Sequence, residues 1–261
     1  MTRFVADLGN SRLKLGRIDE SKSLLDVISL SVKNVDTWRD EIRSTIAGAV
    51  GDAWAISSVN PPVETRLDQI IHEYSPERVV WYRSASEVGA PNRLSEPERA
   101  GADRALAVVA ARSIVGAGRP IVVVLCGTAI TIERIDRDGF WIGGAIAPGM
   151  RIAASALNIG AAKLPFVEPA IDLDHAQSPA TLGLRTQDAI AAGVYWGTIG
   201  SVNYMIDLQC ENEIDRPVVV ASGGDARFFA RRSQGRIDRA IPELTLIGLA
   251  KTAFDISIQS F

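Results

Sequence analysis

Two short stretches of this chain carry the same arrangement of residues, and that arrangement could bind a phosphate group. The first runs from Val5 to Lys14 and turns at Gly9, and the second runs from Val123 to Ile132 and turns at Gly127. Each has the pattern of a strand, a tight glycine turn and a second strand. Such a turn directs backbone N–H groups and a small polar side chain toward a phosphate. One copy in each half of the chain predicts two lobes that bind one nucleotide from opposite sides.

The first turn offers both a charge and hydrogen-bond donors. Asp7 ends the first strand, where a carboxylate can hold a hydrated divalent ion that bridges to ATP. Asn10, Ser11 and the turn amides can donate to phosphate oxygens, and Lys14 adds a positive charge. A plain β-hairpin with an Asn-Ser turn explains the same residues. If the turn does bind ATP, the residues involved are Asp7, Leu8, Gly9, Asn10, Ser11, Arg12, Leu13 and Lys14.

The second turn lacks the acid of the first. Asp7 lies two residues before Gly9, whereas Leu125 lies two residues before Gly127. Gly127 and Thr128 can still donate to a phosphate, but any mechanism that needs an acid from both lobes has lost one.

A third glycine turn, at Gly223 and Gly224, lies between a predicted strand and a predicted helix. A diglycine before a helix allows the base or ribose of a nucleotide to come close. Three glycine turns at strand ends fit the two-lobed fold shared by actin, sugar kinases and the heat-shock ATPases.

The segment from Gly101 to Arg104 begins a predicted helix after a long polar loop. Asp103 lies near the positive end of the helix dipole, which keeps its carboxylate ionised. An ionised aspartate can accept a proton from a hydroxyl that attacks phosphorus, and Arg104 can bind a carboxylate or phosphate through two parallel hydrogen bonds. The alternative is a helix cap followed by a surface arginine.

Composition narrows the class of protein. The net charge of −3 argues against a general nucleic-acid or anionic-membrane surface. Two cysteines, Cys126 and Cys210, are too few for a disulfide framework, so we expect a cytoplasmic protein. We expect no signal peptide, because a strand begins directly after the first residue, and no membrane span. His72 and His175 are the two histidines of the sequence, so acid–base chemistry should depend on carboxylates.

Strands and helices alternate along the chain, which predicts an α/β protein with helices on the faces of its sheets. Strands are predicted at residues 2–8, 11–18, 27–32, 53–57, 79–82, 121–125, 129–135, 140–146 and 218–221. Helices are predicted at residues 35–49, 61–74, 101–115, 187–208 and 244–254, with one more after Pro148 and Gly149 and one after the glycine turn at 223–224. The small residues at 116–120 suggest a boundary, which gives lobes at 1–117 and 118–261.

The long helix at 187–208 carries Gly193, Gly197 and Gly200 at spacings of four and three. Small residues at this spacing let another helix approach closely. That helix can belong to the same lobe or to a second copy of the chain, and the sequence leaves both open.

In order and spacing, these motifs resemble the type III pantothenate kinase family over nearly the whole chain. The segments that carry the resemblance are Asp7 to Ser11, Gly101 to Arg104, Gly127 to Thr131, Gly143 to Gly149, Gly183 to Thr186 and Ser222 to Gly224, together with Ala156-Leu157, Leu164-Pro165, Gly193 and Leu244 to Leu249.

The resemblance implies ATP-dependent phosphorylation of pantothenate, the first step of coenzyme A biosynthesis. It implies two similar actin-like (ribonuclease H-like) lobes, each a mixed sheet flanked by helices, with a nucleotide cleft between them. Asp103 would act as base, and Gly101, Ala102, Asp103 and Arg104 would bind pantothenate. Thr186 would contact pantothenate from the partner subunit of a homodimer. The family uses Mg²⁺ or another divalent ion with ATP, and a monovalent cation, K⁺ or NH₄⁺.

The chain departs from the family pattern at two ligand positions. Leu125 replaces the aspartate that binds the monovalent cation, and Leu94 stands where a tyrosine contacts pantothenate. The first hypothesis is a working pantothenate kinase with altered cation dependence, since phosphoryl transfer rests mainly on positioning and charge stabilisation. The second is a regulatory protein that binds nucleotide or ligand without efficient turnover. The third is a kinase for another small hydroxy acid.

Overall fold

The computed structural model describes residues 2–46, 53–74, 76–171, 178–211 and 213–257. The chain forms two compact units, each with its own sheet and core. Unit 1 comprises Met1–Ile114 and Glu243–Phe261, and unit 2 comprises Val115–Pro242.

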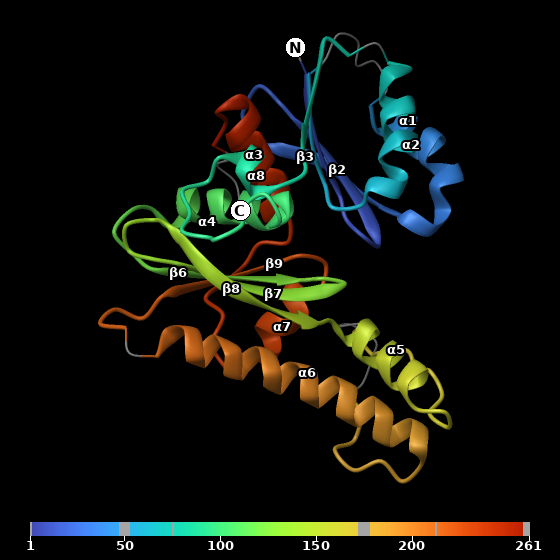
Figure 1. Cartoon of the computed structure of the whole chain (residues 1–261). Helices are drawn as coiled ribbons and strands as arrows, with labels where there is room; N and C mark the ends of the chain where they lie inside the picture. The colour runs from blue at the N-terminus through green and yellow to red at the C-terminus, as the bar shows by residue number, and fades with distance from the viewer. Residues whose placement is uncertain (1, 47–52, 75, 172–177, 212, 258–261) are drawn as a thin grey trace. The chain divides into compact units, whose positions relative to one another are not determined.

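The sheet of unit 1 has five strands in the order β3-β2-β1-β4-β5 (Figure 1). They are β1 (Arg3–Leu8), β2 (Arg12–Ile18), β3 (Leu24–Ser31), β4 (Ala53–Ser58) and β5 (Arg78–Tyr82). The first three strands are antiparallel neighbours, whereas β4 runs parallel to β1, and β5 runs parallel to β4. The short glycine turn permits the antiparallel pair β1–β2, and longer connections through helices return the chain for the parallel pairs.

Helices cover both faces of the unit 1 sheet. They are the 3₁₀ helix η1 (Val32–Thr37) and α1 (Trp38–Thr45), α2 (Pro61–His72), α3 (Ala85–Val88), α4 (Ala102–Val115) and α8 (Leu244–Phe254). Figure 1 shows α1 and α2 together on one side of the strands, where Trp38 and Ile71 pack with Phe4 of β1 in one buried core. On α8, Gly248 leaves room for the backbone of Leu106 on α4, so these two helices approach closely.

The sheet of unit 2 repeats this plan in the order β10-β9-β6-β7-β8. Its strands are β6 (Ile121–Cys126), β7 (Ala129–Ile135), β8 (Trp141–Pro148), β9 (Val218–Ser222) and β10 (Arg239–Ala240). Again the first three strands are antiparallel, the fourth is parallel to the first, and the fifth is parallel to the fourth. The two units therefore have the same topology, and β6 corresponds to β1.

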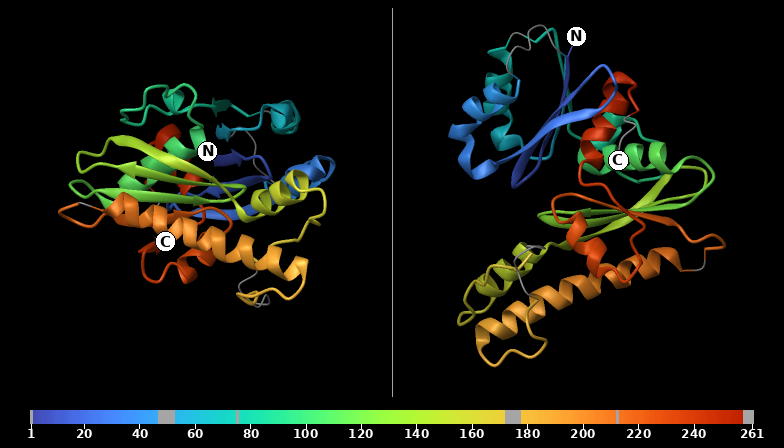
Figure 2. Two further views of the ribbon diagram at one scale, coloured as in Figure 1. Left: turned by 60° about the horizontal axis from the view of Figure 1, so that its bottom comes forward. Right: turned by 180° about the vertical axis from the view of Figure 1, so that it is seen from behind.

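The helices of unit 2 are α5 (Met150–Gly160), α6 (Thr186–Cys210) and α7 (Ala226–Arg232). Figure 2 shows the long α6 running along the sheet, with α5 beside it. Val122, Val124 and Cys126 alternate toward this side of β6 and pack with Val194 and Val202 of α6 in one buried core. The alternate residues of β6, including Leu125, therefore point to the opposite face of the sheet.

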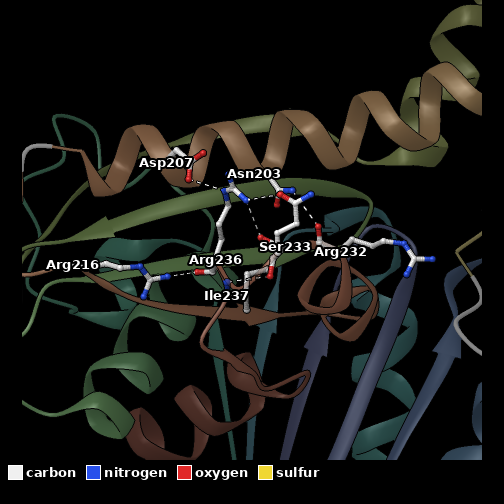
Figure 3. Close-up of polar contacts among 8 residues, drawn as sticks. Asn203, Asp207, Arg216, Arg232, Ser233, Arg236 and Ile237 are labelled. Atoms are coloured by element: carbon white, nitrogen blue, oxygen red, sulfur yellow. Dashed lines mark hydrogen bonds and ion pairs between the residues drawn. The ribbon is translucent and has the colours of Figure 1, made fainter. Parts of the chain in front are cut away.

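Polar contacts hold the segment after α7 in place (Figure 3). Arg236 donates from Nε to Asp207 Oδ1 of α6 at 2.8 Å, and its carbonyl oxygen accepts from Arg216 Nη2 at 2.6 Å. Asn203 of α6 donates to the carbonyl oxygen of Arg232 at 3.2 Å. These contacts tie the segment between α7 and β10 to α6 and to Arg216, which precedes β9.

Most predicted elements are confirmed, and the differences have local causes. The loop at 84–99 contains the short helix α3, and β10 is too short for its pattern to be recognised. Residues 47–49 of the helix predicted at 35–49, and His175, lie outside the described residues.

The division into units differs from the predicted lobes at the C-terminal end. Residues 243–261 were expected in the second lobe, but they belong to unit 1, because α8 packs on β1, β2 and β4. Within the described ranges, no helix combines the length and apolar character needed to cross a bilayer.

Candidate active site

The first glycine turn is a short connection held by hydrogen bonds from a neighbouring loop. Gly9 N donates to Arg12 O at 2.9 Å and closes the turn. Asn60, which follows β4, donates from its side chain to Gly9 O at 3.1 Å. Asn10 and Ser11 are exposed. The turn therefore offers its polar side chains to solvent on a fixed backbone, as a phosphate site requires.

Asp7 lies between two polar residues in one row of the sheet. The strand registers pair it with Lys14 on β2 and with Ser57 on β4. Ser57 is buried, and its hydroxyl donates to Asp7 Oδ1 at 2.5 Å. Burial raises the pKa of the Asp7 carboxyl, while the Ser57 hydrogen bond and the Lys14 charge act in the opposite direction. A divalent cation beside Asp7 would favour its ionised form.

The predicted base lies in the first turn of α4. Asp103 Oδ1 accepts from Arg104 N at 2.9 Å, and both residues are half-buried. A Cβ at position 101 would lie 2.5 Å from Asp103 Oδ1, so Gly101 makes room for the carboxylate. Ser84 pairs with Gly101 in an isolated bridge, which fastens the polar loop to the start of α4.

Val59 joins the first turn to the Gly101–Arg104 segment within unit 1. Its backbone N donates to Leu8 O at 3.1 Å. Its Cγ1 lies 3.1 Å from where a Cβ on Gly101 would be. The structure therefore brings the Asp7–Ser11 turn and the Asp103 region to one edge of unit 1.

The second glycine turn packs against the turn that precedes α5. Gly127 N donates to Ala129 O at 3.2 Å, and Gly149 N donates to Thr128 O at 3.2 Å. A Cβ on Gly149 would collide with the backbone of Gly127 and Thr128. Gly127 and Thr128 are themselves exposed. The Pro-Gly segment thus supports the turn from one side and leaves its other side open to solvent.

The third glycine turn lies beside the second, because β6 and β9 are parallel neighbours and end at the same edge. Gly223 has φ of +94°, and a Cβ there would meet the Cys126 carbonyl oxygen. Asp225 N donates to Cys126 O at 3.2 Å. Gly224 has open space around it within the described part of the chain. Gly223 is therefore required by the backbone, whereas Gly224 leaves room for a ligand.

Two predicted residues, Thr186 and Leu94, lie outside the glycine turns and the start of α4. Thr186 begins α6 in unit 2 and is exposed. Leu94 is half-buried in the polar loop of unit 1, where its N donates to Asn92 Oδ1 at 3.1 Å. The roles of these residues stay predictions.

Sequence reasoning missed Ser57, Val59 and Asn60. The sequence held a partial signal, since a serine pair begins at the end of the buried run at 53–57 and an asparagine stands just before Pro61. It could not be used, because the contacts of this segment with Asp7, Leu8 and Gly9 cross about fifty positions of sequence, as the 51-residue separation of Asn60 and Gly9 illustrates.

Comparisons with known proteins identify the family. The sequence model of type III pantothenate kinase matches residues 3–208. The chain is 32% identical over 258 residues to a type III pantothenate kinase from Listeria monocytogenes, with 94% of each sequence covered. It is 36% identical over 200 residues to one from Sphingopyxis alaskensis, covering 76% of this chain and 74% of the relative.

A solved structure supports the expected fold. A candidate 2-dehydro-3-deoxygalactonokinase from Sinorhizobium meliloti has a TM-score of 0.55 to this chain at 14% sequence identity, and the match covers 99% of this chain and 98% of that one. This similarity confirms the actin-like, sugar-kinase type of fold that the glycine turns predicted. With a family model that spans most of the chain and relatives above 30% identity, the chain belongs to the type III pantothenate kinase family.

Proposed function

We propose that this chain transfers the γ-phosphoryl group of ATP to the hydroxyl of pantothenate, the first step of coenzyme A biosynthesis. The observation that carries the proposal is the common edge of unit 1, where Val59 joins the Asp7–Ser11 turn to the Gly101–Arg104 segment. A phosphate-binding turn and an acid beside one another are the parts that a kinase needs.

In this proposal Asp103 accepts the proton of the pantothenate hydroxyl as its oxygen attacks the γ-phosphorus. The new O–P bond forms while the bond to the β-phosphate oxygen breaks, and ADP leaves with that electron pair. Arg104 binds the pantothenate carboxylate. The turn amides with Asn10 and Ser11 hold phosphate oxygens, and Lys14 balances their charge.

Asp7 fits the role of holding a divalent ion, with the phosphates supplying further oxygens. The described residues contain no group of three or more acidic, cysteine or histidine side chains that could hold a metal by themselves. One carboxylate with phosphate oxygens and water is a common way to bind Mg²⁺. The ion would neutralise charge that develops on the phosphates.

The glycine turns of unit 2 would bind the rest of the nucleotide. Gly127 and Thr128 can donate to phosphates, and the open side of Gly224 suits the base or ribose. Both turns are exposed at one edge of the sheet, which supports this assignment.

We also propose that the chain is a homodimer joined through α6, with Thr186 reaching the pantothenate of the partner subunit. In the described part of the protomer, nothing apart from the adjoining backbone of α6 itself lies within 4 Å of a Cβ on Gly193, Gly197 or Gly200. Tyr204 and Leu208 of the same helix are 64% and 48% exposed. An exposed apolar helix face with small residues favours a partner helix over packing inside the unit.

A cytoplasmic location fits both the use of ATP and the chemistry of the cysteines. The thiols of Cys126 and Cys210 are free, as a reducing compartment would keep them.

The test is ADP release measured by a coupled assay with Mg-ATP and pantothenate, beside a panel of other small hydroxy acids. Pantothenate-dependent release supports the proposal. Release with another hydroxy acid alone would favour a different acceptor, which the Leu94 substitution makes the main competing function. ATP binding without release on any acceptor would identify a regulatory binder.

A further inference from the structure

The two units differ in charge at one equivalent row of their sheets. In unit 1 the row contains Lys14, Asp7 and Ser57, on strands β2, β1 and β4. In unit 2 the corresponding registers place Thr131 on β7 and Ser222 on β9 beside Leu125 on β6. A charged row in one unit thus corresponds to a neutral row in the other.

The neutral row keeps polar atoms that its central side chain cannot satisfy. Thr131 is 8% exposed, and its hydroxyl has no hydrogen-bond partner among the residues that the structure describes. Leu125 cannot accept from it. Ser222 donates instead to Pro242 O at 3.3 Å. In unit 1 the equivalent hydroxyl of Ser57 donates to a carboxylate.

Two acids lie near this row, and neither replaces a carboxylate at position 125. Glu133 is on the same face two residues along β7, but it is buried and accepts from Trp141 Nε1 at 3.0 Å. Asp225 lies close to Cys126. Burial raises the pKa of the Cys126 thiol, and the negative charge of Asp225 raises it further. Cys126 is on the face opposite to Leu125, and the backbone N of Asp225 donates to Cys126 O at 3.2 Å.

Charge at position 125 matters because the residue lies two positions before the Gly127–Thr128 turn. A carboxylate beside bound phosphates repels them unless a cation lies between the two negative charges. The resemblance to the family implies such a monovalent cation, but a leucine with two neutral hydroxyl neighbours does not fit it. Leucine at position 125 cannot hold the cation, but it also does not repel the phosphates. The cation is therefore no longer needed to offset a negative charge at this position.

We propose that this chain binds ATP and acts without a monovalent cation, and that Leu125 is the residue that sets this independence. The part that concerns turnover rests on the proposed function, whereas the part that concerns ATP binding does not.

The experiment measures the Kd of Mg-ATP by titration calorimetry in KCl, NH₄Cl and choline chloride at equal ionic strength. For the wild-type chain, we expect the Kd to change by less than about twofold between the salts. Leu125→Asp should bind ATP about tenfold more weakly in choline chloride than in KCl. Leu125→Asn introduces a side chain of the same shape as aspartate but without its charge. Its Kd for ATP should therefore be as independent of the salt as that of the wild type.

Turnover is then measured in the same salts. A wild-type Kd or rate improved more than about fivefold by K⁺ would overturn the proposal. Asp225→Asn would then test whether Asp225 supplies the charge. Absence of turnover in every salt would reject the proposed function alone, because the wild-type calorimetry still decides cation dependence. The wild-type calorimetry also decides cation dependence if Leu125→Asp fails to fold.

Discussion

Units 1 and 2 share one strand order, one pattern of parallel and antiparallel pairs, and a glycine turn after the first strand. Their chemistry differs. Unit 1 holds Asp7 and Asp103, whereas the turns of unit 2 offer backbone groups, Thr128 and open space at Gly224. The repeated topology therefore preserves the places where ligands can be held, while the charge at each place differs between the units.

The largest effect should come from Asp103→Asn, which would remove the base that unit 2 does not duplicate. The change keeps an oxygen to accept from Arg104 N, so the fold should persist while kcat falls about 10³-fold. Steady-state kinetics with circular dichroism as a check on folding would measure it. Asp36→Asn, on the exposed surface of η1, is the matched control and should leave kcat unchanged. Unchanged turnover in Asp103→Asn would remove Asp103 from this role.

A second test compares the two glycines of the unit 2 diglycine, one of which is expected to affect stability and the other ligand binding. Gly223→Ala forces a Cβ against the Cys126 carbonyl at a φ of +94°, so we expect a loss of roughly 3 kcal/mol in unfolding free energy. Gly224→Ala should unfold at nearly the wild-type denaturant concentration but bind ATP more weakly. Equal destabilisation by both changes in urea would contradict this division.

The third test compares equivalent serines. Ser57→Ala removes a donor to the Asp7 carboxylate and should lower the unfolding free energy by about 2 kcal/mol. Ser222→Ala removes a longer bond to a neutral carbonyl and should cost about 0.5 kcal/mol. Denaturant unfolding of both variants gives the difference. A larger loss from Ser222→Ala would mean that the polar row matters more in unit 2.

The smallest effect concerns pH. The pKa of Asp7 in the folded protein is raised above its ordinary value of 3.8, mainly by burial. The ionised carboxylate therefore lowers stability at neutral pH, and this cost disappears as pH falls from the raised pKa through the ordinary value. Asp7→Asn should raise Tm at neutral pH relative to the wild type, with a gain that shrinks toward about pH 4. A gain in Tm that grows as the pH falls would mean that folding lowers the pKa of Asp7 instead of raising it.

Local patterns were enough to place most strands, helices and glycine turns. The turns at Gly9, Gly127 and Gly223 could be recognised because glycine between apolar runs is a local signal. The final helix was also placed within its observed bounds, Leu244–Phe254. Its assignment to unit 1 could not be predicted, since it depends on packing against strands more than 180 positions earlier, as the contact of α8 with β4 (Ala53–Ser58) illustrates.

The sequence predicted the acidic residues of the candidate site, but it did not predict the contacts that hold their segments together. Asp7 and Asp103 stand out by spacing, yet Val59 joins their segments through one backbone hydrogen bond and one methyl group. Neither contact leaves a distinctive residue type in the sequence, because any apolar residue could supply both. The charge contrast at Leu125 was visible in the sequence. The Thr131 hydroxyl beside it, which has no hydrogen-bond partner among the described residues, could be placed there only from the strand register.

Phosphorus NMR of a reaction containing the wild-type chain, Mg-ATP and pantothenate detects the proposed phosphoryl transfer itself. We expect a new phosphate-ester signal that grows in step with ADP, requires pantothenate and is absent with Asp103→Asn. A spectrum that contains unchanged ATP, or ADP with inorganic phosphate and no ester, would contradict the proposed transfer.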